Sequence, residues 1–159
     1  MFFSSHYLSP LGDILLTSDG RALTGLWFYG QKHFPPTFAN EILPSSELPV
    51  FSETRRWLDL YFAGKCPDFT PPLAPVGTPF RQKAWATLLD IPYGKTTTYK
   101  EIAGRIGCRS FQAVGGAVGH NPISIIVPCH RVLGADGALT GYAGGLEKKE
   151  WMLRMERGR

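Results

Sequence analysis

Residues 98–118 read TYKEIAGRIGCRSFQAVGGAV and contain the signals of two short helices joined by a tight turn. Thr98-Tyr99-Lys100-Glu101 is a capping box, which predicts a first helix that ends at Gly107. Ser110 is a favourable N-cap and predicts a second helix over residues 111–118. Two short helices in this order are typical of a helix-turn-helix, whereas the spacing alone favours an ordinary helical hairpin.

The second predicted helix has small residues where a stable helix has long ones. Its sequence from Gln112 is QAVGGAV, and each glycine inside a helix costs about 1 kcal/mol relative to alanine. Such glycines serve either tight packing against another helix or close approach to a nucleic acid. Nearby basic residues would supply phosphate contacts: Arg81, Lys83, Lys95, Lys100, Arg105 and Arg109.

Positive charge is concentrated in the second half of the 159-residue chain. Residues 1–79 contain five Lys and Arg against seven Asp and Glu, and residues 80–159 contain twelve against six. This imbalance suits a polyanionic partner, although many basic surfaces bind nothing. The charge alone therefore leaves nucleic acid as one of two open interpretations.

The composition excludes a disordered chain, because 43% of the residues are hydrophobic and 13% are aromatic. No segment approaches the roughly 18 consecutive apolar residues of a membrane span. The opening Met1-Phe2-Phe3 lacks the basic and then apolar pattern of a signal peptide. We therefore expect a cytoplasmic protein, associated with the nucleoid when it is bound to DNA, and no membrane partner.

The first half of the chain has the pattern of an α/β unit that ends near residue 75. Alternating apolar residues over 14–17 and 23–28, joined by Asp19-Gly20, predict a β-hairpin. Nine of the 13 prolines lie between Pro35 and Pro79 and predict loops and a linker between two domains.

Two longer helices are also predicted. Residues 52–63 have an amphipathic pattern that stops before Gly64, with one face formed by Trp57, Leu60 and Tyr61. Thr78-Pro79 places an N-cap before a proline at the first helical position, followed by an apolar face of Phe80, Trp85 and Leu88.

A cysteine and a histidine close a long uncharged stretch. Residues 110–130 contain no charged side chain, and the apolar run before Cys129-His130 predicts a buried strand that ends at this pair. His130 is a candidate base for the thiol, but adjacent residues of a strand point to opposite sides, so a bend or a bridging water is needed. A buried structural cysteine beside a hydrogen-bonded histidine is the alternative.

The remaining cysteines and histidines predict neither disulfides nor a metal site. Cys66, Cys108 and Cys129 are odd in number and form no Cys-x-x-Cys pair. The four histidines have no zinc-binding spacing relative to them: His6, His33, His120 and His130.

Several motifs in order over residues 78–157 resemble the O6-alkylguanine-DNA alkyltransferases, also called methylated-DNA-protein-cysteine methyltransferases. The motifs are Thr78-Pro79-Phe80-Arg81-Gln82, Ile91-Pro92-Tyr93-Gly94, Asn121-Pro122-Ile123, Pro128-Cys129-His130-Arg131-Val132, Gly141-Tyr142-Ala143-Gly144-Gly145-Leu146 and Lys149-Glu150-Trp151. Residues 1–75 match only in general character. The resemblance implies an α/β N-terminal domain over 1–75, with a ribonuclease H-like sheet and helix, and a mainly α C-terminal domain over 76–159, with a helix-turn-helix and a short active-site strand.

The resemblance implies a suicide repair reaction on double-stranded DNA. The protein flips an O6-alkylguanine out of the stack, and Cys129 takes the alkyl group by direct displacement, so each molecule acts once. No cofactor or metal is implied. The resemblance is to proteins that act as monomers, and it leaves open both cooperative binding along DNA and repair of O4-alkylthymine.

Roles follow from the resemblance residue by residue. Cys129 is the acceptor, His130 acts as base through a water, and Glu156 orients the histidine. Asn121 braces the turn before the active site, and Tyr99 helps to rotate the target phosphate and protonates the leaving guanine. The implied guanine pocket is lined by Val132, Tyr142 and Ala143. The expected DNA contacts are Thr98, Arg109, Gln112, Ala113, Gly115 and Gly116.

One position departs from the family pattern. Gln112 stands where the family usually has an arginine that enters the base stack, and the loop before it is one residue shorter. Glutamine lacks the cation, so extrusion of the base is less efficient or Arg109 substitutes. Arg131, beside the nucleophile, is expected to be structural.

Three other classes of protein fit the sequence less well. A non-enzymatic protein that recognises alkylated DNA for another pathway would lack the acceptor, so Cys129-His130 argues against it. A cysteine hydrolase needs an oxyanion hole that no motif indicates. A helix-turn-helix regulator is disfavoured, because the small-residue helix offers few side chains to read bases in the major groove.

Overall fold

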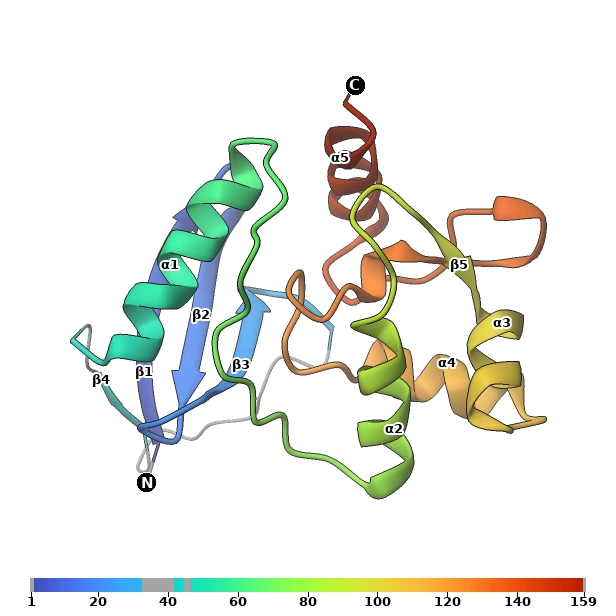
Figure 1. Cartoon of the computed structure of the whole chain (residues 1–159), viewed down its shortest axis with the longest axis horizontal. Coiled ribbons are helices and arrows are strands. Elements are labelled where there is room, and N and C mark those ends of the chain that lie inside the picture. The colour runs from blue at the N-terminus through green and yellow to red at the C-terminus, as the bar shows by residue number, and fades with distance from the viewer. Residues whose placement is uncertain (1, 33–41, 45–46, 159) are drawn as a thin grey trace. The chain divides into compact units, whose positions relative to one another are not determined.

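A four-stranded sheet with one helix packed on it forms the first of two units in this chain (Figure 1). The computed structural model describes residues 2–32, 42–44 and 47–158, and its two units are Met1–Pro75 and Val76–Arg159. Part of the predicted proline-rich loop, from Pro35, lies outside the described residues, as does His33. In the described part of the chain, no helix is long and apolar enough to cross a membrane.

The sheet of the first unit has the strand order β3-β2-β1-β4. Its elements are β1 (Phe2–Ser9), β2 (Gly12–Ser18), β3 (Leu23–Phe28), β4 (Ile42–Pro44) and α1 (Pro49–Phe62). The predicted hairpin is confirmed, because β2 and β3 pair antiparallel with Leu16 opposite Leu26. The sequence pattern does not predict β1 or β4. Buried serines interrupt the apolar alternation of β1, and β4 has only three residues.

Helix α1 begins three residues earlier than the pattern predicts, because Pro49 fits the first helical turn. Trp57 and Tyr61 are buried as expected, together with Leu58. Leu60, the third residue of the predicted face, is half-buried. The helix contacts β1, β2 and β3 and so covers one face of the sheet (Figure 1).

The proline-rich segment after α1 pairs with the outer edge of this sheet. The amide of Leu23 donates to the carbonyl of Pro72 at 2.7 Å, and the amide of Ala74 donates to the carbonyl of Leu23 at 2.8 Å. These bonds satisfy part of the β3 edge, which would otherwise be open for pairing with another chain.

The second unit is mainly helical. Its elements are α2 (Pro79–Leu88), β5 (Thr97–Thr98), α3 (Tyr99–Ile106), α4 (Phe111–Gly119), η1 (Cys129–Arg131), β6 (Val132–Leu133), η2 (Ala135–Gly137) and α5 (Leu146–Glu156). Helices α2, α3 and α4 pack on one another. Trp85 and Leu88 are buried on α2 as predicted, and Phe80 is half-buried.

Each predicted N-cap of this unit is confirmed. The hydroxyl of Thr78 accepts from the amide of Arg81, and the hydroxyl of Thr98 accepts from the amide of Glu101, both at 3.2 Å. The hydroxyl of Ser110 accepts in the same way at the start of α4. Helix α3 ends at Gly107, whose φ of +69° places it in the left-handed conformation. Helices α3 and α4 therefore form the predicted helix-turn-helix.

The expected buried strand before the cysteine is wrong. Residues 123–127 form a turn, in which the β-branched Ile125 has a φ of +72°. Cys129 then opens the 3-10 helix η1, and the short strand β6 follows it and pairs parallel with β5. The apolar run is buried as the pattern requires, but side-chain hydrogen bonds to its backbone replace the pairing of a strand.

Candidate active site

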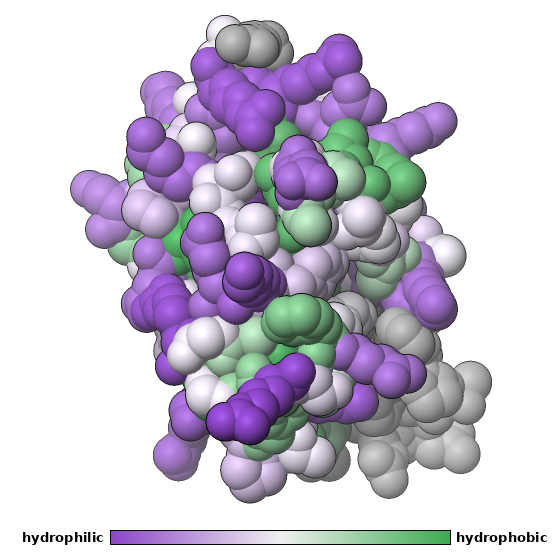
Figure 2. All heavy atoms as spheres, turned by 90° about the vertical axis from the view of Figure 1, so that its right-hand side faces the viewer, coloured by the Kyte–Doolittle hydropathy of each residue, from purple (hydrophilic) through white to green (hydrophobic). Residues whose placement is uncertain are grey.

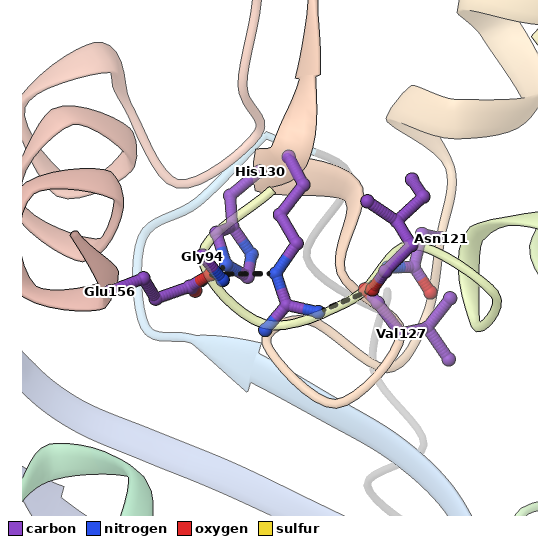
Figure 3. Close-up of polar contacts among 7 residues, drawn as sticks. Gly94, Asn121, Val127, His130 and Glu156 are labelled. Atoms are coloured by element: carbon purple, nitrogen blue, oxygen red, sulfur yellow. Dashed lines mark hydrogen bonds and ion pairs between the residues drawn. The ribbon is translucent and has the colours of Figure 1, made fainter. Parts of the chain in front are cut away.

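Asn121 fixes the turn that leads to Cys129. Its side-chain amide donates to the carbonyls of Ile123 at 3.2 Å and Val127 at 2.8 Å, and its oxygen accepts from the amide of Ile123 at 3.0 Å. Figure 3 shows Asn121 and Val127 side by side. The left-handed conformation of Ile125 is strained for a β-branched residue, and such strain persists only where the surroundings impose it. The three hydrogen bonds of Asn121 hold this turn in place.

His130 and Glu156 form a buried pair beside the cysteine. Nε2 of His130 lies 2.5 Å from Oε2 of Glu156, and the two side chains are 0% and 1% exposed. Glu156 is the last residue of α5 and reaches His130 in η1 (Figure 3). Its other oxygen, Oε1, accepts from Nε of Arg131 at 2.7 Å and from the amide of Gly94 at 3.1 Å. The carboxylate is thus fixed by three donors.

These contacts determine the charges of the pair. Burial alone would raise the pKa of Glu156, but bonds and charges from His130 and Arg131 outweigh it and lower the pKa to about 2. Burial lowers the pKa of His130 despite its bond to Glu156. At neutral pH the carboxylate is therefore ionised and the imidazole is neutral. Because Nε2–H donates to Glu156, the lone pair that can accept a proton belongs to Nδ1.

Cys129 is buried and needs assistance to ionise. Burial raises the pKa of its thiol, while the side chain of Asn121 and the charge of Lys149 act in the opposite direction. A thiol in this state is a poor nucleophile until a base removes its proton. The 3-10 conformation of η1 supplies the bend between Cys129 and His130 that adjacent strand residues would lack.

Lys149 is a buried cation on α5, close to the cysteine. Its ammonium donates to the carbonyls of Val132 and Thr140, each at 2.7 Å, and to that of Gly141 at 3.3 Å. Burial lowers the pKa of Lys149 to about 8, and the neighbouring Cys129 opposes this shift. Lys149 was visible in the sequence only as part of a motif, because a lysine on a polar helix has no signal of its own.

Two tyrosines lie close to the thiol. Burial raises the pKa of Tyr99, with a smaller contribution from Cys129, while a bond to Thr140 opposes the shift. Burial raises the pKa of Tyr142 well above its usual value, again with Cys129 nearby. Both hydroxyls are therefore protonated at neutral pH. Val132 is buried directly after η1, and Ala143 is half-buried next to Tyr142.

A groove of about 600 Å³ runs over the helix-turn-helix. Its lining residues are Thr98, Tyr99, Lys100, Phe111, Gly115, Ala135 and Asp136. The structure thus gathers three of the predicted site residues, Thr98, Tyr99 and Gly115, in one place. Four others are exposed on α4 or on the turn before it: Arg109, Gln112, Ala113 and Gly116.

The glycines of α4 are not explained by packing. Apart from the adjacent residues and the backbone of α4 itself, a Cβ atom built on Gly115 or Gly116 would meet no atom of the described residues within 4 Å. Tight packing against another helix, one of the two interpretations of these glycines, is therefore wrong for the described residues. The bare face of α4, formed by Ala113, Gly115 and Gly116, is therefore free to contact another molecule.

In the described part of the chain, no cluster of His, Cys, Asp and Glu could hold a metal ion. Cys66 is exposed on the first unit, and Cys108 lies in the turn between α3 and α4 with its thiol bonded to the carbonyl of Ser110. Neither is among the groups that affect Cys129.

Both units match models of one protein family. Residues 3–75 match the ribonuclease-like domain of 6-O-methylguanine DNA methyltransferase, and residues 79–158 match its DNA binding domain. The chain belongs to the 6-O-methylguanine DNA methyltransferase family, as the sequence motifs indicated.

Named relatives agree with this membership. A methylated-DNA–protein-cysteine methyltransferase of Haemophilus influenzae is 44% identical, with 98% of this chain and 86% of the relative covered. One of Methanosarcina barkeri is 48% identical over 93% of this chain and 92% of its own length. The structure of Mycobacterium tuberculosis O6-methylguanine methyltransferase superposes with a TM-score of 0.89 at 43% identity, covering 100% and 94% of the two chains. Mycobacterium tuberculosis OGT in complex with DNA gives a TM-score of 0.86 at 43% identity, covering 99% and 92%.

Proposed function

We propose that this protein repairs DNA by transferring the alkyl group of O6-alkylguanine irreversibly to its own Cys129. The observation that carries this proposal is the buried Cys129 beside the His130–Glu156 pair, in a chain of the 6-O-methylguanine DNA methyltransferase family. Relatives of 44% and 48% identity are named methylated-DNA–protein-cysteine methyltransferases. A protein that only recognised alkylated DNA would not need this cysteine.

The transfer is a single displacement at the alkyl carbon. His130 accepts the proton of Cys129 at Nδ1, through the water that the resemblance implies, and the thiolate forms a bond to the alkyl carbon. The bond between that carbon and O6 breaks, and its electron pair leaves with the guanine. Tyr99 donates a proton to the guanine and regains one from His130. The products are a thioether on Cys129 and unmodified guanine in DNA, so the protein acts once.

The environment of the thiol favours this step. Asn121 and Lys149 both favour the thiolate, and Glu156 keeps the imidazole in the tautomer with Nε2 protonated. Lys149 also holds the carbonyls of Val132 and Gly141, which frame the segment assigned to the guanine pocket. Backbone groups at Cys129, Val132 and Tyr142 read the flipped base by hydrogen bonding, and Ala143 completes this wall.

Duplex DNA is the partner, and α4 is the element that approaches it. The bare face formed by Ala113, Gly115 and Gly116 admits a sugar-phosphate backbone or a groove edge. Thr98, at the start of the helix-turn-helix, and Arg109, in its turn, supply phosphate contacts. Residues 76–159 form the DNA-binding and alkyl-acceptor domain. The protein acts as a monomer. It works in the cytoplasm. A related structure at 43% identity is described as a complex with DNA.

A titration tests this function. Increasing amounts of protein are mixed with a duplex that contains one O6-methylguanine, and the repaired fraction is measured after completion. We expect one repaired lesion per protein molecule at most, and none with Cys129→Ser. Cys66→Ser and Cys108→Ser are matched controls that keep full stoichiometry. Repair of many lesions per molecule, or repair by Cys129→Ser, would overturn the proposal.

A further inference from the structure

Phe111 is an aromatic residue left in water on the proposed DNA-binding surface. It is the first residue of α4 and is 58% exposed, the largest value for any aromatic side chain among the described residues. The Ser110 cap fixes the backbone at this end of the helix. A single exposed apolar side chain is common on protein surfaces, so its meaning depends on the residues that surround it.

The surroundings of Phe111 indicate which molecule this is. Phe111 lies one helical turn from Gly115, and both line the groove that also contains Tyr99 and Lys100. The lysine supplies a positive charge for a phosphate, and the glycine lets a backbone come close. Figure 2 shows an apolar group bordered by hydrophilic side chains on the side of the molecule where α3 and α4 lie. This combination of an aromatic face and a cation suits nucleic acid bases with their phosphates.

We propose that Phe111 is a wedge that enters the base stack of duplex DNA and occupies the gap left by the flipped O6-alkylguanine. The inference rests on the proposed function and adds a positioning residue to it. Proteins that kink or open a duplex commonly insert an apolar side chain, phenylalanine among them, between base steps. Phe111 is the long apolar side chain on the exposed face of α4, whose other members are Gln112, Ala113 and Gly116.

Gln112 is the rival for this position, and its chemistry suits the base stack less well. A glutamine amide inside stacked bases loses hydrogen bonds to water that the flat faces of bases do not replace. A phenyl ring has no polar atoms to satisfy and stacks on either neighbouring base. The phenyl ring of Phe111 therefore suits a place between stacked bases better than the amide of Gln112 does.

The test compares transfer from duplex and from single-stranded DNA that contain the same O6-methylguanine, because only the duplex has a gap to fill. We expect Phe111→Ala to lower the ratio of the duplex rate to the single-strand rate by about 10-fold or more, the usual effect of removing one aromatic stacking partner. Phe111→Leu, which is still an apolar wedge, should keep most of the ratio. Leu89→Ala is the matched control, since Leu89 is an exposed apolar residue outside the groove, and should leave the ratio unchanged.

A second substrate separates the wedge from other roles. When the lesion lies opposite an abasic site, the helix is already weakened, and the defect of Phe111→Ala should largely disappear. The inference would be overturned if Phe111→Ala slowed transfer equally from duplex and single-stranded DNA, or did not slow it at all. It would also be overturned if Gln112→Ala lowered the ratio of the two rates and Phe111→Ala did not. A wild-type protein that transfers from neither substrate would instead overturn the proposed function, and this inference with it.

Discussion

His130 and Glu156, 26 residues apart in sequence, meet at 2.5 Å in the interior of the second unit. The carboxylate does not depend on the histidine alone, because Arg131 and the amide of Gly94 bind its other oxygen. This arrangement directs Nε2–H toward Glu156 and leaves Nδ1 to accept a proton. Arg131, expected to be structural, is thus part of the support that keeps Glu156 ionised and in place.

Glu156→Gln should slow methyl transfer by about 100-fold or more, because an amide no longer selects the tautomer of His130. The same change leaves the guanidinium of Arg131 buried without its counter-ion, which destabilises the fold by about 3 kcal/mol. Single-turnover kinetics and urea unfolding measure the two effects. Glu150→Gln on the same helix is the control, because its ion pair with Arg154 is exposed. An unchanged transfer rate in Glu156→Gln would refute the role of the pair.

The stability of the protein should fall in two stages as the pH is lowered. The pKa of His130 is lowered in the folded state. As the pH falls below the ordinary value of 6.5, the unfolded chain therefore takes up a proton at His130 before the folded protein does, and the free energy of unfolding decreases. The pKa of Glu156 is about 2 in the folded state against an ordinary 4.5, so its contribution is present above pH 4.5 and is lost between these values. Urea midpoints from pH 8 to pH 3 measure this. A midpoint in Glu156→Gln that falls as steeply below pH 4.5 as in the wild type would contradict the assignment.

Lys149→Met should lower both activity and stability. Three backbone carbonyls lose their donor, which costs about 2 kcal/mol, and the thiol of Cys129 loses the cation that favours its ionised form. Without that cation the pKa of the thiol rises further, so less thiolate is present at neutral pH and transfer slows. Alkylation of Cys129 by iodoacetamide across a pH range measures the shift. Lys148→Met is the control at the neighbouring position, and equal reactivity in the two variants would show that Lys149 does not act on the thiol.

Gly115→Ala should stabilise the fold and weaken the binding of duplex DNA. The new methyl group meets open space, so the helix gains up to about 1 kcal/mol, but the methyl occupies the face that approaches DNA. Overpacking of that contact by one methyl group weakens duplex binding about tenfold. Gly104→Ala is the matched control, because Gly104 is a glycine inside α3 that also faces open space but lies outside the groove. Thermal unfolding and binding isotherms compare the two. If Gly115→Ala and Gly104→Ala bound duplex DNA equally well, α4 would not be the element that contacts DNA.

Local signals in the sequence predicted the elements that depend on neighbouring residues. The caps at Thr78, Thr98 and Ser110 and the turn at Gly107 are confirmed because each is decided within four residues. The strand β1 has no clear pattern because buried serines interrupt its apolar alternation, and β4 is only three residues long and pairs with β1 about 40 positions away. The apolar run before Cys129 predicts a strand, because an apolar pattern does not reveal the hydrogen bonds of Asn121 that hold this run as a turn.

The candidate site was predictable to different degrees. Cys129 and His130 are adjacent and form a visible pair, whereas Glu156 has no local signal and was placed only through the family resemblance. Lys149 had no signal that separates it from a solvated lysine, and only its three carbonyl partners in the folded chain show its role. Long-range contacts of this kind depend on the packing of α5, which no pattern in the sequence specifies.

The mass of the protein after reaction with O6-methylguanine in duplex DNA tests the central claim most directly. Transfer replaces the thiol hydrogen by a methyl group, so intact-mass and peptide analysis should find a gain of one CH₂ per molecule, located on Cys129. Cys129→Ala should gain none while it still binds the duplex. A methyl group on Cys66 or Cys108, or an unmodified protein together with repaired DNA, would contradict the account.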